Sequence, residues 1–202
     1  QTRRKLDVAE GHHKRALAIN EQLGRLPDMA DNYGMLGLLY QMRGNLDVAE
    51  EHHKKSLAIN EQLGRFPELA DNYGMIGRVY HSREELETAE ELHKKSLAIN
   101  RRLNRSKEMG DNWNNLGWIE SDRDNCVNAF EYLEKARVMY ETVGCKYEVA
   151  INYMLLGVVE VQRGGLAEAR ECWSKAIGTF GELGYTEQVD VLQSELDALP
   201  PD

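Results

Sequence analysis

Apolar residues recur three and four positions apart along most of the chain, in separate runs divided by short polar segments. One run contains Tyr33, Leu36 and Tyr40, and the next begins at Leu46 and continues through Leu57. This spacing places apolar side chains on one face of an α-helix, because a helix has about 3.6 residues per turn. The pattern therefore predicts an all-α chain of amphipathic helices, arranged in pairs.

These helix pairs repeat with a period of 40 residues. The string Leu-Asp-Val-Ala-Glu at Leu6 returns at Leu46 and, in changed form, at Leu86, Cys126 and Leu166. The first two copies, residues 6–45 and 46–85, are identical at 27 of 40 positions, far above what shared helical composition produces. A fixed period of this length predicts a stack of similar units, each unable to bury its apolar face alone.

Glycine and proline mark the ends of the expected helices. Gly44-Asn45 and Gly164-Gly165 lie between the two helices of a unit, where residues that accept a positive φ reverse the chain cheaply. Proline opens the following helix at Pro27 and Pro67, where a missing N–H costs nothing. The positions that follow the second helix, which we expect to end it, are Gly24, Gly64, Asn104, Gly144 and Gly184.

The residues that fix the repeat resemble the signature of the tetratricopeptide repeat (TPR) family. In one unit this signature comprises Tyr33, Leu36-Gly37, Tyr40, Ala49, Ser56 and Leu57, and it returns in three further units. The resemblance implies a right-handed superhelical solenoid of antiparallel helix pairs, with about ten helices and close helix approach at each Leu-Gly. We expect one solenoid domain over residues 1–202: a half repeat at 5–24, repeats at 27–64, 67–104, 107–144 and 147–184, and a capping helix at 186–199.

Two features depart from the usual family pattern. Glu120 and Glu160 replace the aromatic residue of the first helix in the third and fourth units, so packing there is expected to differ from that at Tyr40 and Tyr80. The unit is also six residues longer than the usual 34. The longer form resembles repeats of kinesin light chain, of Pins-type adaptors and of bacterial regulatory proteins, and it therefore names no single partner.

In this family the first helices line a concave groove, and one stripe of their side chains faces it. We call the corresponding positions the first-helix stripe and predict that they bind a peptide. The members that we assign to it are Asp31, Met35, Leu38, Asp71, Met75, Arg78, Asp111, Asn115, Trp118, Leu155 and Val158.

The chemistry of this stripe favours a partner with apolar anchors and some basic residues. Flexible methionines suit an adaptable surface, and Trp118 is a typical binding hot spot. Two alternatives stay open. The recurring aspartates either meet a basic ligand or merely offset the helix dipole in the first turn. The recurring asparagines either hold a ligand backbone or bridge neighbouring helices; they are Asn32, Asn72, Asn112 and Asn152.

The chaperone-binding members of the family clamp a terminal carboxylate with Lys, Arg and Asn in this groove. Only Arg78 and Asn115 match that arrangement here, against three aspartates. We therefore predict that no such carboxylate ligand is bound.

The fourth first helix is apolar nearly all round, which predicts that something covers it: a partner, a second copy or the chain's own tail. The residues concerned are Ile151, Met154, Leu155, Val158 and Val161. The helix from Leu6 to Leu23 lacks a first helix of its own, so self-association through this open face is also expected. Since the chain starts at Gln1 without methionine, we expect residues upstream in the full protein.

No motif for catalysis, nucleotide binding or metal binding appears, so we predict no enzyme activity, no cofactor and no metal site. Adjacent histidines such as His12-His13 point about 100° apart on a helix and cannot chelate one ion. His13, His53 and His93 fall where the family packs an aromatic residue, which favours hydrogen-bonded core histidines over ligands.

Composition limits the remaining possibilities. The chain has 202 residues, 42% of them hydrophobic, and a formal charge of −9, which argues against a nucleic-acid binder. No apolar run approaches the roughly 20 residues that a membrane helix needs. Three unpaired cysteines, Cys126, Cys145 and Cys172, fit a reducing compartment, so we expect a cytoplasmic protein.

These observations lead to one main hypothesis for the function. We expect a non-catalytic protein-interaction scaffold whose groove binds a peptide or helix of another protein. The alternative is a sensor or regulatory segment of a larger signalling protein, which binds a short peptide or small effector.

Overall fold

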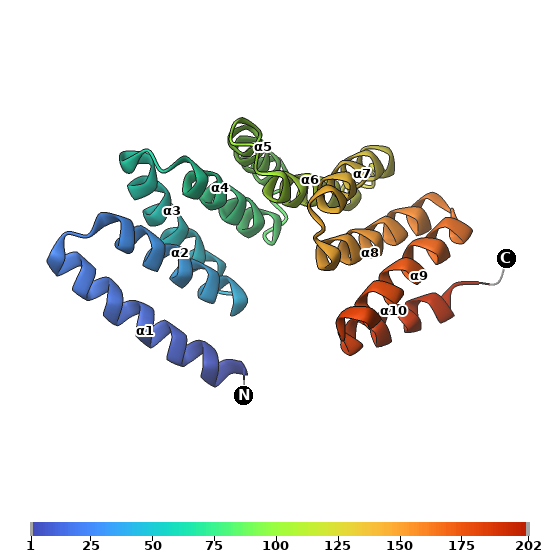
Figure 1. Ribbon diagram of the computed structural model, residues 1–202, viewed down its shortest axis with the longest axis horizontal. Helices are drawn as coiled ribbons and strands as arrows, with labels where there is room; N and C mark the ends of the chain where they lie inside the picture. Colours follow the sequence, from blue (N-terminus) through green and yellow to red (C-terminus); the bar gives the residue numbers. More distant parts are fainter. Residues whose placement is uncertain (1, 201–202) are drawn as a thin grey trace. The chain divides into compact units, whose positions relative to one another are not determined.

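The computed structural model describes residues 2–200, and all regular structure in this range is helical (Figure 1). The prediction of an all-α chain with about ten helices is confirmed. The helices are α1 (Thr2–Leu23), α2 (Leu26–Met42), α3 (Leu46–Leu63), α4 (Phe66–His81), α5 (Leu86–Arg102), α6 (Ser106–Asp122), α7 (Cys126–Val143), α8 (Lys146–Arg163), α9 (Leu166–Leu183) and α10 (Thr186–Ala198).

The helices divide between two compact units. Unit 1 comprises residues 1–103 and contains α1 to α5; unit 2 comprises residues 104–202 and contains α6 to α10. Within each unit, successive helices pack against one another, most extensively as the hairpins α2–α3, α4–α5, α6–α7 and α8–α9. Each hairpin is one copy of the 40-residue repeat. Its two helices bury their apolar faces against each other and against the next hairpin of the same unit.

A glycine in each first helix allows its hairpin to close tightly, as the Leu-Gly signature predicts. A Cβ atom built on Gly37 would lie 2.6 Å from the ring of His53, and one built on Gly157 would lie 2.2 Å from the indole of Trp173. Gly77 lies similarly close to the side chain of His93, and Gly117 to that of Leu133. The second-helix residue that fills this space therefore varies, whereas the glycine does not.

Left-handed backbone conformations end the helices where the sequence predicts them. Gly64, Gly144 and Gly184 are left-handed C-caps, and Asn104 adopts φ +55° at the corresponding place. The inner turns of the hairpins also need a positive φ. Glycine provides it at positions 44 and 164, whereas Glu84 (φ +62°) and Asp124 (φ +57°) adopt it without that freedom.

A cluster in unit 2 resolves what covers the apolar fourth first helix. Ile151, Met154 and Val161 pack against a cluster that contains Phe180 of α9 and Leu192 of α10. Leu155 packs against the neighbouring cluster, and Val158 is the one member of the five classed as exposed. Most of this helix is therefore packed within its own unit, mainly against α9, its partner in the hairpin, and Val158 stays exposed.

An arginine at the end of three first helices is held between an acid and an aromatic ring; the three are Arg43, Arg83 and Arg163. In unit 1, Arg43 of α2 pairs with Glu10 of α1 and lies 5.9 Å from the ring centre of Tyr40. The Tyr40 hydroxyl donates to the same Glu10 carboxylate at 2.7 Å. Because Lys14, Tyr40 and Arg43 all bond to Glu10, the pKa of this carboxyl falls to about 2.

In unit 2 the acid and the aromatic ring have exchanged helices. Glu160 stands on α8 where α2 has Tyr40, and Phe130 stands on α7 where α1 has Glu10. Arg163 bonds to Glu160 at 2.9 Å and lies 5.0 Å from the ring centre of Phe130. The arginine thus keeps both kinds of partner, which explains how a buried Glu160 is tolerated in place of an aromatic residue.

Glu120, the other departure from the pattern, is satisfied within its own hairpin. Its carboxylate accepts from Arg123 at 2.7 Å, from Asn125 at 2.6 Å and from Asn128 at 3.2 Å. Packing at both glutamates therefore differs from that at Tyr40 and Tyr80, as expected.

The recurring asparagines of the first helices connect helices. Asn72 is buried between α3 and α4, where its side chain bonds to Ser56 at 3.0 Å and to Asn60 at 2.8 Å. Asn152 is fully buried and donates to the Leu133 carbonyl at 3.1 Å. These contacts favour the structural interpretation of the asparagines over ligand binding.

Candidate functional site

The first-helix stripe of unit 1 lies on α2 and α4, two helices that contact each other. Residues 31, 35 and 38 share one face of α2, since they are four and three positions apart, and 71, 75 and 78 do the same on α4. Asp31, Met35, Asp71 and Arg78 are exposed, whereas Leu38 and Met75 are half-buried. This half of the stripe therefore combines accessible apolar atoms with charges of both signs.

The first-helix stripe of unit 2 lies on α6 and α8, which also contact each other. Trp118 is 47% exposed and Val158 is 41% exposed, although both are large and apolar. Asp111, Asn115 and Leu155 are half-buried around them. Exposed tryptophan is uncommon outside binding surfaces, because its large apolar area gains most from burial.

The aspartates of the stripe do not occupy the first turn of their helices, so the helix-dipole interpretation is wrong. The first-turn acids are Asp28 in α2, Glu68 in α4 and Glu108 in α6. Asp31 and its equivalents lie one turn further on, where the effect of the dipole has fallen off.

The aspartates of the stripe already interact with other residues of the chain. Asp31 pairs with Arg65 at 3.0 Å. Asp111 pairs with Lys107 at 3.1 Å and accepts from the Tyr140 hydroxyl at 2.9 Å. The negative charge offered to a basic ligand by this stripe is therefore smaller than a count of aspartates suggests.

Of the predicted core histidines, His53 and His93 are buried and His13 is half-buried, and His53 is not hydrogen-bonded. His53 is 1% exposed, and neither of its ring nitrogens has a partner. Burial, together with the positive charges of His52 and Arg78, lowers the pKa of His53 to about 4. His13 is half-buried and its Nδ1 lies 3.2 Å from Asn32 Oδ1. The expectation of a satisfied core histidine therefore fails at His53.

Among residues 2–200, no three His, Cys, Asp or Glu side chains come together in a way that suits a metal ion. Within the same range, no helix combines the length and the apolar character that crossing a bilayer requires.

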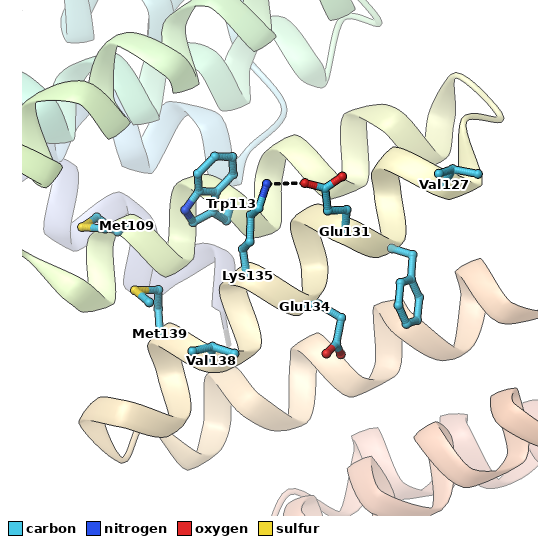
Figure 2. Close-up of a pocket in the computed structure, with 9 residues that line it drawn as sticks. Met109, Trp113, Val127, Glu131, Glu134, Lys135, Val138 and Met139 are labelled. Atoms are coloured by element: carbon cyan, nitrogen blue, oxygen red, sulfur yellow. Dashed lines mark hydrogen bonds and ion pairs between the residues drawn. The ribbon is translucent and has the colours of Figure 1, made fainter.

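Unit 2 contains an apolar pocket that the sequence prediction missed (Figure 2). It has a volume of about 600 Å³ and lies between α6 and α7, away from the first-helix stripe. A signal for it exists in the sequence: α7 has Val127 and Val138 where α3 has Asp47 and Ala58. The lining residues are Met109, Trp113, Val127, Phe130, Glu131, Glu134, Lys135, Val138 and Met139.

Comparison with known proteins identifies the repeat. A model of the tetratricopeptide repeat family matches residues 1–62 and 30–102, about half of the chain. The chain belongs to the tetratricopeptide repeat family. No match to a curated protein was found. The TPR signature at Tyr33, Leu36 and Gly37 therefore has the meaning that the sequence predicted.

Solved structures show the same TPR-type fold at low sequence identity. BtubC (BKLC) from P. vanneervenii is 15% identical, with a TM-score of 0.72 and coverage of 98% of this chain and 94% of that one. A putative kinesin light chain from Podospora anserina with nearly identical TPR-like repeats is 16% identical, with a TM-score of 0.70 and coverage of 92% and 91%. At these identities the likeness concerns the fold alone.

A third similar structure is a signal-transduction ATPase with numerous domains, which carries a TPR sensor, from Pyrococcus horikoshii. It is 22% identical, with a TM-score of 0.72. The match covers 83% of this chain but only 26% of that protein. TPR hairpins of this type thus occur both in short repeat proteins and as one part of large ones. The family membership indicates a protein-interaction scaffold, since stacked helical repeats present extended binding surfaces.

Proposed function

We propose that this TPR chain is a non-catalytic scaffold that binds a peptide or helix of another protein on its first-helix stripe. The observation that carries the proposal is the exposure of large apolar side chains there, above all Trp118 at 47% and Met35 at 43%. A partner that buries such residues gains free energy in proportion to the apolar area removed from water.

The charges of the stripe define what such a partner should contain. Asp71 and Arg78 are exposed on α4 beside the half-buried Met75. Asp31 and Asp111 are balanced by Arg65 and Lys107. Apolar anchors should therefore dominate the affinity, with one or a few basic residues of the partner pairing with the aspartates.

A double variant tests this proposal. Met75→Ala with Trp118→Ala removes one apolar side chain from the stripe in each unit, and we expect at least a tenfold loss of affinity for the partner. The measurement is affinity capture with the wild type beside the variant, followed by identification of the proteins that are lost and titration of the purified partner.

The matched control replaces exposed apolar residues of second helices, which lie off the stripe. Ile19→Ala with Val143→Ala also affects one residue in each unit, at 55% and 45% exposure. This control should capture the same proteins as the wild type. If the double variant of the stripe stays folded and binds its partner as tightly as the wild type does, the stripe is not the binding site.

A second candidate function is a regulatory or sensor segment of a larger signalling protein that binds a short peptide or small effector. It is favoured by the likeness to the P. horikoshii ATPase, in which similar repeats form a quarter of the chain and are described as a sensor. A full-length gene that joins this chain to a kinase, ATPase or DNA-binding domain would support it, whereas repeats alone would contradict it.

A further inference from the structure

The outward face of α7 differs from the outward faces of the equivalent helices in unit 1. In α3, Asp47 and Ala58 occupy the positions of Val127 and Val138, and α5 has Glu87 and Ala98 there. Position 130 changes in the same direction, from glutamate in α3 and α5 to phenylalanine in α7. A charged and small-residue surface has therefore become apolar in one helix only.

Val127 and Val138 are not covered by the rest of the chain, whereas Phe130 is half-buried beside Arg163. Val127 is 74% exposed and Val138 is 47% exposed. Together with Trp113 and Met109 of α6 they surround the pocket of about 600 Å³ (Figure 2), a size within the usual range of binding pockets. Exposure of this much apolar surface in one place marks an interaction site in a soluble domain.

Trp113, at the floor of the pocket, is held by two neighbouring side chains of α7. The Trp113 ring lies 5.3 Å from the ring of Tyr132, and the Lys135 ammonium lies 4.9 Å from its centre. Lys135 is fixed in turn by Glu131, at 2.5 Å. A pre-ordered aromatic floor loses little conformational entropy when a ligand binds.

The charge around the pocket favours a basic ligand. Residues 1–103 contain equal numbers of acidic and basic side chains, so the entire formal charge of −9 belongs to unit 2. The lining contains two acids and one base, Glu131, Glu134 and Lys135, and the neighbouring Arg137 and Arg163 are paired with Glu134, Glu141 and Glu160. An acidic ligand would meet repulsion here, whereas a basic one would meet attraction.

We propose that the pocket between α6 and α7 docks a basic amphipathic helix of another protein. One or two apolar side chains of that helix fill the space over Trp113 between Val127 and Val138. Its Lys or Arg residues join the existing ion pairs at Glu131 and Glu134. This surface is separate from the first-helix stripe. Trp113 and Trp118 are five residues apart on α6, which turns their side chains about 140° from one another around the helix.

The test uses a defined probe: a fluorescein-labelled helical peptide of about 15 residues with leucine on one face and lysine on the other. Binding to the whole chain is measured by fluorescence anisotropy at about 0.15 M salt, where long-range attraction is screened. We expect the wild type to bind this peptide, and to bind at least tenfold more weakly a matched peptide in which glutamate replaces every lysine.

Two substitutions restore residues that the same fold already uses, so the chain should fold normally. Val127→Asp and Val138→Ala introduce the residues of α3 at the corresponding positions. Each should weaken binding of the lysine peptide, Val127→Asp by about tenfold or more, because a carboxylate at the rim opposes burial of leucine. Leu183→Ala, at an exposed apolar residue of α9 away from both surfaces, should leave the affinity unchanged.

The direction in which Val127→Asp changes the affinity for the lysine peptide distinguishes docking in the pocket from simple charge attraction. If the lysine peptide were held only by the negative charge of unit 2, an added carboxylate would tighten binding. Tighter or unchanged binding by this variant overturns the proposal, as does a loss of similar size with Leu183→Ala. Sedimentation of the chain alone provides a further check: a wild-type dimer that Val127→Asp dissociates would make a second copy the occupant and would also overturn it.

Discussion

The spacing between a first helix and its second helix is decided by single glycines. At Gly37 the backbone passes so close to His53 that a methyl group would overlap the imidazole ring. Gly34, one turn earlier on the same helix, has only Ser56 Oγ within reach, at 3.6 Å from a built Cβ. Two glycines three residues apart thus have different roles, although both occur in a helix that glycine intrinsically weakens.

We therefore predict opposite effects for the same substitution at these two sites. Gly37→Ala should lower the free energy of unfolding by about 2 kcal/mol, because His53 is buried and has no room to move. Gly34→Ala should raise it by up to about 1 kcal/mol, through better helix propensity. Urea denaturation followed by far-UV circular dichroism measures both. Equal destabilisation by the two variants would contradict the close approach at Gly37.

At the scale of the elements, the turns inside the hairpins keep their backbone conformation from repeat to repeat although their residues change. Glu84 and Asp124 keep the positive φ that glycine provides at positions 44 and 164. An L residue in this conformation costs roughly 1–2 kcal/mol relative to glycine, and aspartate tolerates it better than glutamate does. The turns of the α4–α5 and α6–α7 hairpins are therefore strained, and the helices on either side impose their geometry.

This strain predicts a stabilising substitution. Glu84→Gly should raise the free energy of unfolding by about 1 kcal/mol, and Asp124→Gly by less. Differential scanning calorimetry would show the gain as a higher melting temperature. The control is Glu85→Gly, the next residue along, which has a negative φ of −85° and should bring no gain.

Much of this element structure could be predicted from the sequence, and the reason is local. Helix ends depend on residues such as Gly64 and Pro67, and hairpin closure depends on the Leu-Gly pair, so each signal acts within a few residues. Division of the chain after Leu103 could not be predicted, because the 40-residue period runs through it without interruption. The period specifies helices but not how firmly neighbouring repeats pack.

In the candidate site, features that depend on one helix could be predicted from the sequence, whereas features that depend on packing between helices could not. Exposure of Met35 and Trp118 followed from helical phase alone. The ion pair from Arg65 to Asp31 did not, because the two residues are brought together by packing of α2 near the start of α4. The pocket at Val127 also depends on packing, since two helices have to meet to form it.

For the whole molecule, the two units differ in how they should respond to acid. All six histidines lie in residues 1–103, and unit 2 contains none. In unit 1, burial holds the pKa of His53 at about 4 and lowers that of His52. The unfolded chain takes up these protons near pH 6.5. Since the unfolded state then binds more protons than the native state, stability falls as the pH drops from about 6.5 to about 4.

We predict that lowering the pH from 7 to 5 destabilises unit 1 by about 2 kcal/mol through His53. Unit 1 contains no tryptophan, so the fluorescence of Trp113, Trp118 and Trp173 reports unit 2 alone. In urea at pH 5, circular dichroism should show loss of helix before this fluorescence changes. Coincident transitions at pH 5 and pH 7 would contradict the prediction.

His53→Leu should remove most of this acid response. The variant introduces the residue that α7 already has at Leu133, where it packs against Gly117 in the same way. It also eliminates two buried nitrogens without partners, so stability at pH 7 should not fall. The exposed His12 provides the control, since His12→Leu should keep the acid response of the wild type.

The exchange of acid and aromatic ring around Arg43 and Arg163 determines where this chain can be cut and rejoined. Each arginine reaches partners on its own helix and on the second helix of the preceding repeat, so α1 and α2, or α7 and α8, have to be inherited together. A crossover in the turn between repeats would leave Tyr40 facing Phe130, or Glu10 facing Glu160. The segment that recombination can move intact is therefore a second helix together with the first helix that follows it, rather than a hairpin. Its ends lie at the inner turns of the hairpins, such as the turn at Gly44.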